Sequence, residues 1–151
     1  MKAVGTRLLA LCFIIMALAV QPAQAGSVGA DKVMRDWYRL VLELVRHTPT
    51  YSPPVASRAF AYLGVTAYEG LASGDRTLTS LSGQLNGLTP VPQREAGLAY
   101  DEAVVMQAAL SSAARQLFGN TGPTGQRALK RMTEKLSADV SEGLAPDLVA
   151  R

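Results

Sequence analysis

Residues 52–74, SPPVASRAFAYLGVTAYEGLASG, contain only two charged side chains, Arg58 and Glu69. The two prolines that follow Ser52 suit the first turn of a helix, where a missing N–H group costs little, and Ser52 can cap that turn. Apolar residues then occupy positions all round the expected helix. A helix that is apolar on every side, yet too polar to span a membrane, is typical of the centre of a bundle. We therefore expect other helices to cover this second helix.

Arg58 and Glu69 lie eleven residues apart. On a helix this spacing places them within roughly 20° on one face but about 16 Å apart along the axis, so they cannot pair with each other. We expect both to be structural buried charges, each held by a partner in a neighbouring segment. An unpaired buried charge costs several kcal/mol, so alanine at either position is predicted to destabilise the fold. The alternative is that they line a pocket as its cation and its carboxylate.

Three further helices are predicted around the second one. The first begins at Asp31, which can act as its cap, and ends at His47 before Thr48-Pro49. The third covers about residues 92–118, and the fourth covers about 124–142, with an apolar face of Leu129, Met132, Leu136 and Val140. Turn residues mark 74–91 as a loop, and no stretch alternates as a strand does. The predicted fold is an all-α bundle of about four helices with a central apolar second helix.

Residues 1–25 have the pattern of a secretory signal peptide. Lys2 and Arg7 precede an apolar run at residues 8–20, and Ala23-Gln24-Ala25 offers a cleavage site. Thirteen residues are too few to cross a bilayer, so we expect cleavage after Ala25, export to the periplasm or medium, and no stable membrane anchor afterwards. The domain would then comprise residues 26–151, which contain no cysteine. Loss of two cations lowers the formal charge of +3 to +1, and no basic block suggests nucleic-acid binding.

Residue types that carry catalysis are scarce in this sequence. The single histidine, His47, falls at a predicted helix end, where the helix dipole favours its charged form. Asp101 and Glu102 are sequence neighbours that point about 100° apart on a helix, which indicates a solvated face. No zinc-protease, nucleophile-elbow or phosphate-loop motif occurs. The residues therefore predict no catalytic, cofactor-binding or metal site in this chain.

Two segments carry a resemblance to a known family. SPPVASRAFAYLGVTAYEGL at 52–71, followed by TSLSGQLNGL at 79–88, resembles the N-terminal part of secreted vanadium-dependent haloperoxidase-related proteins, of the type 2 phosphatidic acid phosphatase superfamily. The helix with Trp37-Tyr38 and the run at 99–119 fit as well, so the resemblance covers most of 26–151. It implies a helical bundle around an oxyanion site for vanadate or phosphate. That site uses motifs of the form KxxxxxxRP, PSGH and SRxxxxxH, all absent here.

The resemblance therefore transfers no catalytic residue to this sequence, and vanadate or phosphate would be expected only in a full-length relative. The first hypothesis is a truncated or fragmentary relative that supplies N-terminal scaffold helices, with a separately encoded C-terminal half or a homo-oligomer as its partner. The alternative is a self-sufficient exported four-helix binding or interaction domain. A third hypothesis, an enzyme active by itself, lacks the oxyanion cage that the family uses. Vanadate-dependent bromide oxidation or phosphate-ester hydrolysis by the chain would support it.

Overall fold

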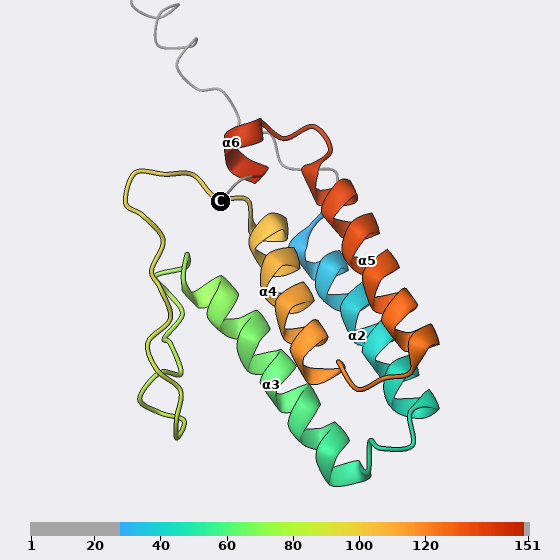
Figure 1. Ribbon diagram of the computed structural model, residues 1–151. Helices are drawn as coiled ribbons and strands as arrows, with labels where there is room; N and C mark the ends of the chain where they lie inside the picture. The colour runs from blue at the N-terminus through green and yellow to red at the C-terminus, as the bar shows by residue number, and fades with distance from the viewer. Residues whose placement is uncertain (1–27, 150–151) are drawn as a thin grey trace, which may run out of the picture.

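The computed structural model describes residues 28–149, and four long helices account for most of that range (Figure 1). In chain order they are α2 (Ala30–His47), α3 (Pro53–Ala72), α4 (Glu102–Leu117) and α5 (Pro123–Ser141), followed by the single turn α6 (Pro146–Val149). The long helices pack against one another, which confirms the predicted all-α bundle. The predicted signal peptide at 1–25 lies outside the described residues. Among those residues, no helix combines the length and hydrophobicity needed to cross a membrane.

The centre of the bundle is occupied by α4. This helix contacts α2, α3 and α5, whereas α3 packs mainly on α4 and lies at the edge of the bundle (Figure 1). The expectation of a central second helix was therefore wrong. The physical reason is that much of the apolar character of α3 comes from alanine and glycine, whose small surfaces cost little when they face water. Larger side chains of α4, such as Met106 and Leu110, are instead almost completely buried.

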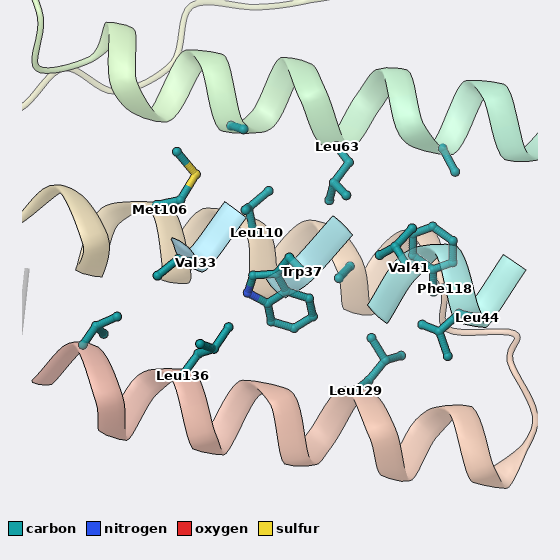
Figure 2. Close-up of a cluster of buried hydrophobic side chains, with 14 of the residues drawn as sticks. Val33, Trp37, Val41, Leu44, Leu63, Met106, Leu110, Phe118, Leu129 and Leu136 are labelled. Atoms are coloured by element: carbon teal, nitrogen blue, oxygen red, sulfur yellow. The ribbon is translucent and has the colours of Figure 1, made fainter. Parts of the chain in front are cut away.

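Trp37 joins three helices in the core. It is fully buried on α2, and Figure 2 shows it among side chains of α4 and α5, including Leu110 and Leu136. Its Nε1–H donates a hydrogen bond of 2.7 Å to Oε1 of Gln107 on α4. The amide nitrogen of Gln107 in turn donates to the Thr133 carbonyl oxygen and to Ser137 Oγ on α5, at 3.2 Å each. Because buried polar groups must find partners, this chain of bonds specifies how α2, α4 and α5 align.

The helix starts differ from the predictions at two places. The N-cap position of α2 is Gly29, and Asp31 lies inside the first turn, where its carboxylate accepts a 2.7 Å hydrogen bond from Arg35. The third helix starts at Glu102 and not near residue 92. Asp101 caps it by accepting from the N–H groups of residues 103 and 104 at 2.9 and 3.1 Å. Upstream, Gly97 has a φ of +82°, which a continuing helix does not allow.

The predicted pattern of α5 is confirmed. Its core side contains the fully or nearly buried Leu129, Leu136 and Val140, and Met132 packs against them while partly exposed. On the opposite side two ion pairs follow the i, i+4 rule: Lys130–Glu134 at 3.8 Å and Lys135–Asp139. Regular amphipathic spacing is therefore sufficient to place this helix.

Candidate interaction surface

One side of α3, which borders its contact with α4, is divided into two halves of different character. Val55, Arg58, Tyr62, Thr66 and Glu69 follow one another at intervals of three or four residues, so they share this side of the helix. Glu69 is only 4 % exposed, whereas Val55 and Tyr62 are 47 % and 54 % exposed. The C-terminal half of α3 is therefore covered, and the N-terminal half is open.

The cover over the C-terminal half is the loop between α3 and α4. The Glu69 carboxylate accepts hydrogen bonds from Ser80 Oγ at 2.9 Å and from the Leu81 N–H at 2.6 Å. One residue earlier, the Tyr68 hydroxyl donates to the Thr79 carbonyl oxygen at 2.8 Å. The prediction that Glu69 is buried and holds a neighbouring segment is confirmed. These contacts also join the two segments, 52–71 and 79–88, on which the family resemblance depends.

Arg94 holds the end of the same loop against the C-terminus of α3. Its Nη2–H donates to the Gly70 carbonyl oxygen and its Nε–H to Ser73 Oγ, at 3.1 Å each. Both ends of the guanidinium bind the Glu102 carboxylate, at 2.6 and 2.8 Å, and Arg94 Cζ lies 5.4 Å from the centre of the Tyr100 ring. The hydrogen bond to Glu102 raises the pKa of Arg94 above its usual value, so the side chain stays charged. A cation at this position offsets the negative end of the helix dipole.

A cavity of about 730 Å³ lies between the end of α3 and the loop that Glu69 and Arg94 hold. The polar groups at its wall include Asp75, whose carboxylate accepts hydrogen bonds from the hydroxyl and the N–H of Thr77 at 2.7 and 2.8 Å. Those two hydrogen bonds lower the pKa of Asp75. The polar contacts around this cavity hold the loop in place, so these contacts help to keep the C-terminal half of α3 covered.

The open half of α3 borders a groove that it shares with α4. The groove has a volume of about 390 Å³, and all the residues that line it are uncharged. They include Tyr62 and Thr66 from α3 and, across the groove, Ala113, Gln116 and Leu117 from α4. An exposed aromatic ring beside a shallow groove of small side chains is a common feature of protein–protein contacts. The groove could accept the side chains of another helix.

Arg58 lies on this open half, one turn before Tyr62. The prediction that it is a buried charge was wrong, since its side chain is exposed. Within residues 28–149 it forms no ion pair or hydrogen bond. The reason is positional: the loop's hydrogen bonds to α3 fall between residues 68 and 73, more than two helical turns beyond Arg58. Arg58 and Glu69 do share one side of the helix, as their spacing predicts, but only the carboxylate has a partner.

The other charged residues of interest have structural roles. His47 is exposed at the end of α2, with Nδ1 2.8 Å from the Glu43 carbonyl oxygen and 3.6 Å from its carboxylate. Asp101 and Glu102 do not form a plain solvated face, because the first caps α4 and the second binds Arg94. In the part of the chain that the structure describes, no three His, Cys, Asp or Glu side chains are grouped closely enough to hold a metal ion.

Sequence reasoning missed Arg94. It stands 21 residues beyond Ser73 in a loop, and no periodicity relates the two positions. One signal was present: Gly74 has no room for a side chain, since a Cβ atom there would lie 2.2 Å from Arg94 Cζ. A glycine at the end of a helix is too common, however, to identify which distant residue approaches it.

Comparisons of the chain with known protein families, with curated proteins and with solved structures give no match.

Proposed function

We propose that this chain is a helical scaffold that acts by packing the open half of α3 against another protein element. The observation that carries the proposal is the exposed line of Val55, Arg58 and Tyr62 beside an uncharged groove. Half of an apolar helix is covered by the chain's own loop, and the other half has the same character with no cover from the described residues. A second protein element would cover the open half of α3, as the loop covers the C-terminal half.

The chemistry of the surface indicates the kind of partner. An apolar or small-residue helix would fill the groove next to Tyr62, and a carboxylate on it would pair with Arg58. A second copy of this chain fits less well, because its corresponding surface contributes another arginine, and the carboxylate on that side, Glu69, is already bound to Ser80 and Leu81. We therefore infer a different partner, a helix with an acidic residue beside an apolar stripe.

The family resemblance supports a specific version of this partner. In vanadium haloperoxidase-related proteins, helices of the C-terminal half form the oxyanion site, and an N-terminal scaffold of the present kind would pack beside them. The scaffold would have its own folded core, since Trp37, Leu110 and Leu136 are fully buried within this chain. The alternative function, a self-sufficient exported interaction domain, uses the same surface with an unrelated helical partner.

The test is a binding titration between the purified chain and the C-terminal half of a vanadium haloperoxidase-related protein that carries the Arg-Pro and Ser-Gly-His motifs. We expect a one-to-one complex by calorimetry. Tyr62→Glu and Arg58→Glu should each weaken it by at least about tenfold, or 1.4 kcal/mol. Leu42→Glu is the matched control, because Leu42 is 50 % exposed on α2, and it should leave affinity unchanged.

Three results would separate the readings. If no complex forms with this probe, the proposal that the partner is the family's catalytic half fails. If a complex forms but Tyr62→Glu and Leu42→Glu weaken it equally, the α3 surface is the wrong site. If light scattering shows a dimer of the chain alone that Tyr62→Glu dissociates, the partner is a second copy and the inferred acidic helix is wrong.

A further inference from the structure

Asn86 and Gly87 occupy the tip of an exposed turn in the loop that covers α3. Both residues are exposed, and the turn is closed by a hydrogen bond of 3.2 Å from the Leu88 N–H to the Leu85 carbonyl oxygen. Gly87 has a φ of +79°, the conformation that the third position of a type II turn requires. Within residues 28–149, neither the Asn86 side chain nor the Gly87 N–H forms a hydrogen bond.

This arrangement leaves a nucleophile and an electrophile next to each other without competing contacts. The Gly87 nitrogen is the atom that can close a five-membered ring on the Asn86 side-chain amide carbon. Glycine carries no side chain that would obstruct this approach, and a Cβ atom built on Gly87 would meet nothing within 4 Å, so the surroundings are open as well. Reactions between groups held in one short segment gain rate because no second molecule has to be brought to them.

We propose that Asn86 is a site of spontaneous deamidation through a cyclic imide. The Gly87 nitrogen loses its proton to solvent and forms a bond to Asn86 Cγ. The bond from Cγ to the amide nitrogen breaks, and ammonia leaves with a proton from water. Water then adds to one of the two imide carbonyl groups and breaks one C–N bond, which gives either an aspartate or an isoaspartate. No oxidant, enzyme or cofactor takes part.

The other asparagine of the chain provides an internal comparison. Asn120 is followed by a threonine, and its side chain is held at both ends: Oδ1 accepts from the Tyr51 hydroxyl, and Nδ2 donates to Thr50 Oγ1 at 3.3 Å. Its amide carbon is therefore fixed by two contacts that would have to break before a ring could close. The two asparagines in one molecule should deamidate at very different rates.

The consequence of the reaction is local to the cover on α3. Aspartate adds a negative charge to the turn, and isoaspartate also lengthens the backbone by one methylene group. Both changes fall five residues after Leu81, the position that Glu69 holds. The reaction would thus alter the loop over α3 with the age of the protein while the bundle core stays unchanged.

The experiment is a time course of the purified full chain at mildly alkaline pH, followed by trypsin digestion and mass spectrometry. Cleavage after Arg76 and Arg94 isolates Asn86, and cleavage after Arg115 and Arg127 isolates Asn120. We expect the first peptide alone to gain the mass of an amide-to-acid change, with isoaspartate detected by an isoaspartyl methyltransferase.

A synthetic peptide of residues 81–91 sets the unconstrained rate. We expect the folded chain to react within about tenfold of it, equivalent to no more than about 1.4 kcal/mol of added barrier. Asn86→Gln should abolish the mass gain, which excludes the two glutamines in the same peptide as its source. A rate in the folded chain more than about tenfold below that of the peptide, aspartate without isoaspartate, or equal conversion of Asn120 would each overturn the proposal.

Discussion

Removal of the Glu69 carboxylate should destabilise the protein, whereas removal of the Arg58 guanidinium should not. Glu69 is 4 % exposed and accepts two hydrogen bonds, from Ser80 Oγ and the Leu81 N–H. Hydrogen bonds to a charged group contribute about 1.5–3 kcal/mol each, and both donors are part-buried, so water compensates for some of the loss. We therefore expect Glu69→Ala to lower the free energy of unfolding by about 2–4 kcal/mol.

Arg58→Ala should change the free energy of unfolding by less than about 0.5 kcal/mol, because an exposed side chain without a partner in the described residues contributes little. Glu69→Gln provides a graded comparison. Its amide oxygen can accept from Leu81 while its nitrogen donates to Ser80, so we expect it to recover part of the lost stability.

Urea unfolding followed by circular dichroism measures the global effect, and hydrogen exchange of the Leu81 N–H measures the local one. A loss of 2 kcal/mol at the loop corresponds to roughly 30-fold faster exchange at Leu81. If Glu69→Ala unfolds like the parent and Leu81 exchanges at the parent rate, the loop is not held by Glu69. If Arg58→Ala is as destabilising as Glu69→Ala, Arg58 is buried and the edge position of α3 is wrong.

Three further substitutions test the packing. Gln107→Ala leaves the Trp37 N–H without a partner in the core, so it should lower the free energy of unfolding by about 2–4 kcal/mol. Urea unfolding, followed by the emission of the single tryptophan, measures this change. A loss below about 0.5 kcal/mol would contradict the hydrogen-bond network. Gly74→Ala should destabilise the protein by about 1–2 kcal/mol, because the new Cβ displaces Arg94. Gly70→Ala lies inside α3 with only ordinary contacts at 3.8 Å, so it should stabilise the protein by about 0.5–1 kcal/mol. Thermal unfolding compares the two variants, and the reverse order of stability would contradict the close approach of Arg94 to Gly74.

The helices that could be predicted most fully are those with one apolar and one charged side. On α2, Val33 and Trp37 fall at core spacing between charged residues, so position and orientation follow from the pattern. The pattern of α3 has no such contrast. Alanine and glycine are compatible with both burial and exposure, and its place at the edge depends on how α4 packs, which only the folded chain determines.

The candidate surface was predictable in part for a related reason. Glu69 could be expected to find a partner, but the identity of Ser80 and Leu81 depends on how a loop of irregular backbone returns to the helix. Arg94 is brought to α3 by the same path of the loop. Arg58 lies on the same side of α3 as Glu69 but is exposed, because the loop's hydrogen bonds to α3 fall near the C-terminal end of that helix. Helical periodicity therefore identified the side of α3, and the path of the loop decided which half is open.

The account depends most on the exposure of Tyr62 in the open half of α3. Nitration of the free protein with tetranitromethane, read residue by residue with mass spectrometry, tests this directly against Tyr51. That side chain is 8 % exposed, and its hydroxyl proton is shared between the Leu117 carbonyl oxygen and Asn120 Oδ1. We predict rapid modification of Tyr62 and protection of Tyr51 in the folded chain. Protection of Tyr62 to the same degree as Tyr51 would contradict an open surface on α3.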